Sequence, residues 1–469
     1  MDSGRGPVRR TEKSNSIRIM GWVVLALLAA VVALTGGASR YDAIQIVPLR
    51  AFSALFLIPA FYYLTLESLR EQRALITLFG CYALLVLVQL VPLPPGIWQA
   101  LPGRGTIVQL DSALGLEDVW RPFTLAPLRS WNVFGSLVVP AAGLFLAIAL
   151  RAPSRVLLQL IAGLGVLNAV LGLLQVVAGK SSALYFYELT NKGAPVGIFA
   201  NENHAAIFAA CSLLVVTSLA LRAREARNAT RERLIYPVAF FLIIVTSLVG
   251  ASRAGLAATF GAVIVSLVMF AFSARGHRGR SANDPVQRWL KTHPKLVLVF
   301  PVVAITLTAA AFLLLDRTPA FQDILAKDSF ADLRWSLWPV IGEMLGAHWI
   351  LGSGLGSFEQ VYSIYEPSGL LMPQYVNQAH NDWVQFIIEG GFLAGLLLLG
   401  LIVWIAKSIA TVSRRESAHV ETLFWVSIFS IVGVASVVDY PLRTPAFQLA
   451  MIWLLVALSR DCAARKQRD

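Results

Sequence analysis

The chain has 469 residues, of which 57% are hydrophobic and only 14% are charged. A soluble domain carries about 25% charged residues, so this composition excludes a chain of ordinary soluble domains. The net charge of +12 would suit a nucleic-acid-binding protein. However, the basic residues lie between apolar runs and form no patch interleaved with aromatic side chains. The composition therefore predicts a membrane protein that binds no nucleic acid.

Apolar runs follow one another along almost the whole chain, and a helix needs roughly 20 apolar residues to cross a bilayer. The runs are continuous rather than alternating, which predicts helices and not a barrel of strands. We therefore expect an all-α polytopic membrane protein with about 12 transmembrane helices. In chain order they are predicted at Ile19–Gly36, Ile44–Leu66, Ala74–Val91, Trp131–Leu150, Val156–Val177, Ala205–Leu221, Leu234–Val249, Ala254–Phe272, Leu296–Leu315, Trp383–Ile405, Leu423–Val438 and Thr444–Leu458.

The orientation is predicted from Lys and Arg, which are retained on the cytoplasmic side of short loops. Most of the 39 Lys and Arg residues fall in alternate segments, beginning with the N-terminus. We therefore expect a basic cytoplasmic N-terminus (1–18), one membrane domain (19–460) and a cytoplasmic tail (461–469). Three outer segments are long: Pro92–Ser130, Ala178–His204 and the periplasmic loop 316–382. Loops of that length are usually functional, so we expect the chemistry at the outer face.

An amphipathic helix is predicted within the third outer segment, over Phe330–Leu345, and is expected to lie along the membrane surface. Arg334 lies on this helix, and Arg253 lies in a short outer turn between two apolar runs. A guanidinium matches phosphate oxygens with two hydrogen bonds, so the two arginines could bracket a diphosphate. The alternatives are a lipid headgroup contact for Arg253 and an intrahelical contact for Arg334.

A polar stripe enters the apolar run at Trp383. Asn381, Gln385 and Glu389 recur at four-residue spacing after His380, so the three lie on one helix face. An imidazole can take a proton from a sugar hydroxyl near neutral pH, which makes His380 a candidate base. An acid inside an apolar helix is a functional hypothesis by default, and the alternative role of Glu389 is to support a kink at Gly390–Gly391.

Three further polar motifs flank predicted helices. Asn201–His204 opens the sixth helix, where one asparagine is expected as an N-cap while Asn203 and His204 are candidates for substrate contact. Gly352–Ser357 lacks the lysine of a nucleotide loop and predicts a tight turn. In Asp439–Arg443 an internal ion pair is expected, with Arg443 also a substrate candidate. No histidine spacing suits a metal, so we expect no metal and no cofactor.

Taken in order, these motifs resemble the O-antigen ligase and polymerase family. The resemblance covers about 197–401. Its matching pieces are Gly197–His204, Ser252–Arg253, Arg334 with Trp338, Gly352–Phe358, Gln378–Gln385 and Glu389–Gly391.

This resemblance implies an architecture like that of GT-C glycosyltransferases in the bacterial cytoplasmic membrane. It also implies inverting, metal-independent transfer from a polyprenyl-diphosphate-linked glycan to an acceptor hydroxyl. The acceptor would be a glycan, a lipid A core or another hydroxyl. His380 would be the base, assisted by Glu389. Arg253 and Arg334 would bind the diphosphate, and Asn203, His204, Asn381, Gln385 and Arg443 would contact substrate.

A transporter or flippase of lipid-linked glycans is the alternative. It would place charges at mid-membrane in several helices and would show repeated halves. Both signs are scarce in this sequence.

Overall fold

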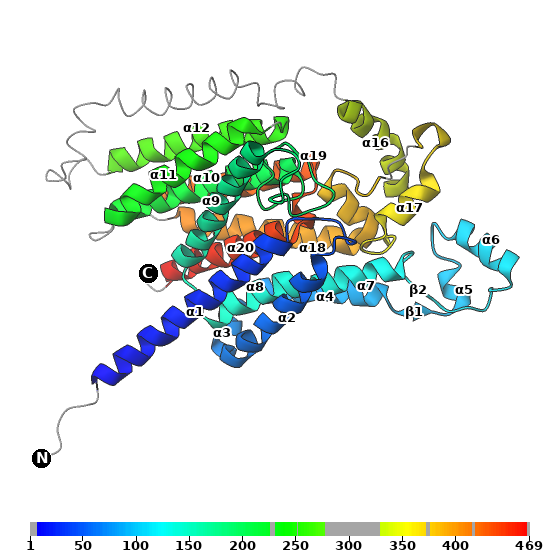
Figure 1. The fold of residues 1–469 in the computed structure, drawn as a ribbon. Coiled ribbons are helices and arrows are strands. Elements are labelled where there is room, and N and C mark those ends of the chain that lie inside the picture. The colour runs from blue at the N-terminus through cyan, green and yellow to red at the C-terminus, as the bar shows by residue number, and fades with distance from the viewer. Residues whose placement is uncertain are drawn as a thin grey trace, which may run out of the picture.

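The computed structural model describes residues 7–225, 230–250, 252–276, 329–371, 376–414 and 418–466. Within these ranges the chain is almost entirely helical (Figure 1). The long helices are α1 (Pro7–Thr35), α2 (Ile46–Tyr63), α4 (Arg73–Gln89), α8 (Val138–Ala149), α9 (Ser154–Ala178), α10 (Glu202–Glu225), α11 (Thr230–Val249), α12 (Arg253–Gly276), α16 (Ser329–His348), α18 (Asp382–Ser413), α19 (His419–Val438) and α20 (Pro445–Lys466). The shorter elements are α3 (Leu66–Glu71), β1 (Pro92–Leu93), α5 (Pro95–Trp98), α6 (Gly105–Leu114), β2 (Arg121–Pro122), α7 (Pro127–Ser136), α17 (Phe358–Tyr365), η1 (Ser368–Leu370) and η2 (Pro441–Arg443).

Each transmembrane helix predicted within the described residues is present as helix, and the one predicted at Leu296–Leu315 lies outside them. In the described chain, 9 helices are long and apolar enough to cross a membrane. The apolar part of α1 and the whole of α4 are shorter. The chain is therefore a multi-pass, all-α membrane protein, and the number of twelve spans stays a prediction.

Helix α10 forms the centre of one half of the bundle. It packs against α9, α11, α12 and α19, and nearly all of its side chains are buried, as expected for a helix that is apolar on every face. In the other half, α2 packs on α8 and α4 packs on α18 (Figure 1). Helix α20 joins the halves because it contacts α8, α9 and α18.

The two ends of the bundle differ. The start of α1 and the end of α20 lie at one end, while β1, β2, α5, α6, α16 and α17 lie at the other (Figure 1). We call this second end the loop-rich end. It carries described parts of the long connections that the Lys and Arg pattern predicts to be outside.

Two details of the fold were not predicted. The helix expected at Trp131–Leu150 is present as the span Pro127–Ala149, with a turn at Leu137 between α7 and α8. Pro140 explains the break, because proline has no N–H to donate to the carbonyl four residues before it. In addition, β1 and β2 form a two-stranded antiparallel sheet that pairs Pro92 with Pro122.

The predicted amphipathic helix is present as α16, but its apolar side chains pack against other helices and not against the membrane surface. Leu337, Val340, Ile341 and Met344 are buried in a cluster with residues of α17 and α18. The apolar stripe thus packs against protein, and α16 covers the loop-rich end of α18.

Helix α18 changes direction at Gly391, whose φ of 65° and ψ of −158° are not helical. The Gly352–Ser357 segment is the predicted tight turn, with positive φ at Gly352, Gly354 and Gly356. It lies against the kink: the Gly354 N–H donates to the Glu389 carbonyl oxygen at 2.9 Å. A Cβ on Gly352 would lie 2.6 Å from that same oxygen, so only glycine permits this approach.

Candidate active site

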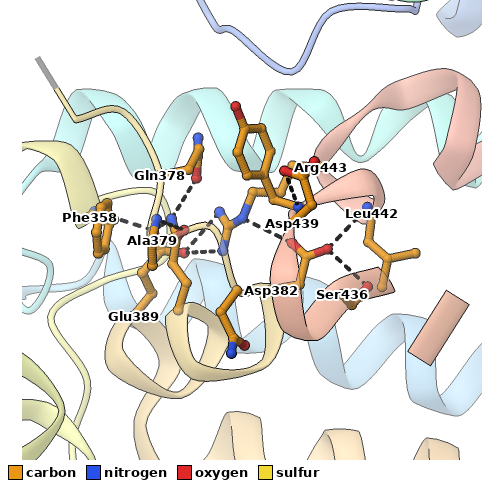
Figure 2. A network of polar contacts seen from close by, with 12 residues as sticks. Phe358, Gln378, Ala379, Asp382, Glu389, Ser436, Asp439, Leu442 and Arg443 are labelled. Atoms are coloured by element: carbon orange, nitrogen blue, oxygen red, sulfur yellow. Dashed lines mark hydrogen bonds and ion pairs between the residues drawn. The ribbon is translucent and has the colours of Figure 1, made fainter. Parts of the chain in front are cut away.

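The turn between α19 and α20, Asp439–Arg443, is the centre of the site. Its Arg443 guanidinium lies between two carboxylates at the start of α18 (Figure 2). Nε is 3.3 Å from Asp382 Oδ1, and Nη2 is 3.3 Å from Glu389 Oε2. Both carboxylates are almost completely buried. Buried charges are tolerated when they are paired, so Arg443 ties the start of α18 to the 439–443 turn.

Glu389 and Gln385 extend this network toward His380. Glu389 Oε1 accepts hydrogen bonds from Gln385 Nε2 at 3.0 Å and from the Phe358 N–H at 3.3 Å. Gln385 in turn accepts the Ala379 N–H at 2.9 Å. Because Ala379 immediately precedes His380, the chain of contacts from Arg443 fixes the backbone that carries the imidazole (Figure 2).

Asp439, at the other end of the same turn, lies between two histidines. Its Oδ1 is 3.7 Å from His380 Nδ1 and 3.8 Å from His204 Nε2. The ring of Tyr440 contacts both imidazoles edge-on, with centroids 5.0 Å apart in each case. His204 is also in hydrogen-bond contact with the Thr444 hydroxyl, at 3.0 Å from Nδ1. One carboxylate thus lies within ion-pair distance of two imidazole rings.

The two histidines differ in exposure. The His204 side chain is 1% exposed and that of His380 is 18% exposed. With Nδ1 of His380 toward Asp439, its Nε2 is the nitrogen left for a substrate. His380 also has a φ of 51°, which few residues other than glycine adopt. Backbone strain of this kind is frequent at functional sites, and here it sets the direction of the ring.

The electrostatics of the turn favour a carboxylate at Asp439 and a cation at Arg443. Burial raises the pKa of Asp439, but His204 and His380 outweigh it, so this pKa lies below its ordinary value. Burial lowers the pKa of Arg443, but Glu389 and Asp382 outweigh it, so this pKa lies above its ordinary value. Both groups therefore keep their charges over the physiological pH range.

A cavity of about 430 Å³ opens beside these residues, between α2, α4, α8, α18 and α20. Its lining at the loop-rich end is polar and includes Arg443, Asp382, Gln378 and Arg40. Toward the other end its lining is apolar. A smaller cavity of about 210 Å³ shares Ala38, Ser39, Arg40 and Asn377 with the first and is lined by Tyr440. Its other lining residues include Asn191, Asn201 and Thr190, which are suited to sugar hydroxyls.

Residues 238–399 match the family model described as O-Antigen ligase. This segment therefore carries an O-antigen ligase domain. The match includes α12, α16 and the part of α18 with Asp382, Gln385 and Glu389. It leaves out the Asp439–Arg443 turn and everything before α11. No curated protein matches the chain.

Of the residues that the family resemblance indicates, His380, Gln385, Glu389 and Arg443 are brought together. Arg253 begins α12 and is exposed. A Cβ on Gly255 would lie 2.2 Å from the Ala206 Cβ, so the first turns of α12 and α10 are adjacent. This places Arg253 at the loop-rich end. Arg334 lies on α16, and its side chain lies outside the described residues.

Several residues for which a role was expected have partners inside the protein. Asn381 is a buried N-cap that accepts the Val384 N–H at 3.0 Å. His204 is buried behind Asp439 and does not reach the solvent. The ion pair expected between Asp439 and Arg443 is absent among the described contacts, because each has other partners.

The N-cap of α10 is Asn201, which accepts the Asn203 N–H at 2.8 Å. Asn203 itself is half-buried in the first turn of α10.

Asp382 was missed as a member of the site, and Asp439 was expected only as the ion-pair partner of Arg443. Asp382 follows the N-cap Asn381. An acidic residue is common in the first turn of a helix, because it interacts favourably with the helix dipole. The signal that could have identified Asp439 is His204, a second outer histidine at the start of α10. Two histidines at the outer face could indicate a carboxylate that lies near both. Among the described residues, no group of three or more His, Cys, Asp and Glu side chains is arranged to hold a metal ion.

Proposed function

We propose that this protein, which carries an O-antigen ligase domain, transfers a glycan from a polyprenyl-diphosphate carrier to an acceptor hydroxyl at the periplasmic face. The observation that carries the proposal is His380: a partly exposed imidazole close to the Asp439 carboxylate, in a segment whose residues Gln378 and Asp382 line a cavity that is polar at one end and apolar at the other. This combination suits a reaction between a lipid-linked donor and a water-exposed acceptor. The bacterial cytoplasmic membrane is the compartment that such donors imply.

The reaction is a single displacement. His380 Nε2 takes the proton of the acceptor hydroxyl while its oxygen attacks the anomeric carbon. The bond between that carbon and the diphosphate oxygen breaks, and the diphosphate leaves with the electron pair, so the configuration inverts. The Asp439 carboxylate stabilises the imidazolium that forms. No nucleotide takes part, because the bond between the sugar and the diphosphate of the donor already supplies the driving force. The proposed transfer is also independent of a metal.

Arg253 and Arg334 neutralise the charge that develops on the leaving diphosphate. Cations that are already in place need little reorganisation as charge develops, which makes this kind of stabilisation effective. The position of Arg253 beside the first turn of α10 supports its part in the proposal. Asn203 and the polar smaller cavity are the proposed contacts for sugar.

Glu389 and Gln385 are proposed as positioning residues rather than as groups that touch the substrate. Their hydrogen-bonding atoms are occupied by Arg443, Phe358 and Ala379. This revises the catalytic role expected for Glu389 from the sequence.

Replacement of the base tests the proposal directly. His380→Ala is expected to lower transfer by about 10²- to 10⁴-fold in membranes supplied with a polyprenyl-diphosphate glycan and an acceptor. His419→Ala, at the start of α19 and the opposite end of the bundle, is the matched control and is expected to keep full activity. Wild-type transfer by His380→Ala, at equal protein abundance, would remove the base from the proposal.

Arg253→Lys tests the donor site, because lysine keeps the charge and loses the planar fork. We expect a higher KM for the donor with an unchanged amount of protein in the membrane. An unchanged KM would assign Arg253 to a lipid headgroup.

A further inference from the structure

A second histidine lies next to the site, and the proposed reaction does not use it. His204, in the first turn of α10, is almost completely buried. Its Nδ1 is 3.0 Å from the Thr444 hydroxyl oxygen, and its Nε2 is 3.8 Å from Asp439 Oδ1. The two ring nitrogens of His204 therefore face two different groups, one of which is the carboxylate beside His380.

The Thr444 hydroxyl determines which nitrogen of His204 carries the proton. Thr444 is completely buried, and among the described residues its hydroxyl has no hydrogen-bond partner except His204 Nδ1. A buried hydroxyl without an acceptor is costly, so this hydroxyl donates its hydrogen bond to Nδ1. A neutral imidazole has one N–H, which then lies on Nε2 and faces Asp439.

The Asp439 carboxylate has few other partners. Its Oδ1 accepts the Tyr440 N–H at 3.0 Å and lies 3.7 Å from His380 Nδ1. In the part of the chain that the structure describes, Asp439 Oδ2 has no hydrogen-bond partner, and neither has His204 Nε2. A buried carboxylate is stable only with donors around it, so the N–H of His204 contributes to keeping this side chain in place.

We infer that His204 is a positioning residue of the base. The Thr444 hydroxyl fixes the His204 proton on Nε2, and this N–H holds the Asp439 carboxylate. The carboxylate in turn orients the His380 ring with its Nε2 toward the acceptor. The two histidines are therefore opposite tautomers, with the proton on Nε2 in His204 and on Nδ1 in His380.

The inference rests on the proposed function and concerns the same site. It assigns His204 a role different from the substrate contact that the family resemblance implies. His204, Asp439 and Thr444 all lie outside residues 238–399, which match the family model.

The tautomers can be measured directly. The chain contains 6 histidines, so the full-length protein labelled with nitrogen-15 histidine gives few ring signals in solid-state NMR. The spectra are recorded in lipid bilayers at about pH 8, where an ordinary imidazole is neutral, and the nitrogen shift distinguishes a ring N–H from a bare ring nitrogen. His204→Gln identifies the His204 signals by their loss.

We expect the His204 proton on Nε2 in the wild type and a mixture of both tautomers in Thr444→Val. The control is Thr217→Val, which removes another buried hydroxyl, from α10 itself, and should leave the wild-type tautomer. A proton on Nδ1 of wild-type His204, or on both of its nitrogens, would overturn the inference.

Glutamine reproduces both contacts of His204, because its amide oxygen can accept from Thr444 while its amide N–H donates to Asp439. His204→Gln should therefore keep the kcat of transfer within about twofold, whereas His204→Leu should lower kcat roughly tenfold. KM should stay unchanged in both variants, since His204 does not touch the substrate. Equal losses of kcat in the two variants would mean that His204 acts only through packing, which contradicts the inference.

Thr444→Val is the sharper kinetic test, because valine has nearly the shape of threonine and lacks the hydroxyl. In the wild-type background it should lower kcat about fivefold, the effect of one net hydrogen bond. In the His204→Gln background it should change kcat by less than about twofold, because an amide has no second tautomer. Thr444→Ser keeps the hydroxyl and should keep wild-type kcat. A loss of the same size in both backgrounds would rule out control of the tautomer.

These outcomes are distinguishable from a failure of the proposed function. If His380→Ala kept wild-type transfer, the proposed base would be wrong, and the spectra would still report the position of the His204 proton. If His380→Ala lost transfer while His204→Leu kept full kcat, the base would stand and the positioning role of His204 would be overturned.

Discussion

The Arg443 ion pairs allow a quantitative test of how the site is held together. At 3.3 Å, two unit charges attract each other by about 5 kcal/mol with an effective dielectric constant of about 20. Desolvation of both groups offsets part of this energy. Asp382 still compensates Arg443 when Glu389 is neutralised. We therefore expect Arg443 and Glu389 to be coupled by about 2 kcal/mol, within the range known for buried pairs in contact.

The perturbations are Arg443→Gln, Glu389→Gln and the double variant. Arg443→Gln should lower the free energy of unfolding by about 3–5 kcal/mol, because it leaves two buried carboxylates without a cation. Glu389→Gln should lower it by about 2 kcal/mol, since Arg443 keeps Asp382 as a partner. The double variant should be more stable than the sum of the two losses predicts.

Reversible unfolding in mixed micelles with increasing SDS measures these free energies. The exposed Arg151–Glu67 pair provides the control cycle, with side chains 47% and 74% exposed, and should couple by less than about 1 kcal/mol. Additivity of Arg443→Gln and Glu389→Gln within about 0.5 kcal/mol would refute the idea that this ion pair holds the start of α18.

Two further predictions concern His380 and the kink. Asp439→Asn should lower kcat about 10- to 100-fold with little change in KM, since the amide cannot stabilise the imidazolium; transfer kinetics would contradict this if only KM rose. Because the folded-state pKa of Asp439 is depressed, its contribution to stability is present above the ordinary value of about 3.9 and is lost as pH falls below it. The stability difference between wild type and Asp439→Asn should therefore shrink below about pH 4 in thermal unfolding. Gly391→Ala should destabilise the protein by at least about 1–3 kcal/mol, since a Cβ there would lie 2.5 Å from the Leu351 carbonyl carbon at a φ of 65°; Gly395→Ala, where a Cβ meets no atom within 4 Å, is the control.

The sequence predicts the helices well because a continuous apolar run in lipid satisfies its backbone hydrogen bonds by forming a helix. The run from Trp383 is α18, and the run from Ala205 lies within α10. The break at Leu137 was not predicted from hydropathy. A hydropathy pattern does not show that Pro140 leaves the carbonyl group four residues before it without a hydrogen-bond donor. The small sheet was missed for a related reason: two residues in each strand are too few to show an alternating pattern.

The site was predicted in part. His380 and the stripe through Gln385 and Glu389 were found because polar residues in an apolar helix stand out. Their partners could not be identified, because spacing along one helix contains no information about contacts across the bundle. Arg443 lies 54 residues from Glu389 in the sequence and yet pairs with it. The short distance between Asp439 and Arg443 suggested the wrong pairing for the same reason.

The backbone around Gly391 separates the site mechanically from the rest of α18. The Ile388 and Glu389 carbonyl oxygens accept the Ser353 and Gly354 N–H groups, and the Phe392 N–H donates to the Ile350 carbonyl oxygen. The helical ladder is therefore replaced at this point by bonds to a loop. The long segment that follows can tilt with the thickness of the bilayer, while the two turns that carry Asp382 and Glu389 stay fixed to their surroundings. Membranes whose lipids differ in chain length should consequently change the tilt of α18 after Gly391 without changing the distance between Arg443 and its carboxylates.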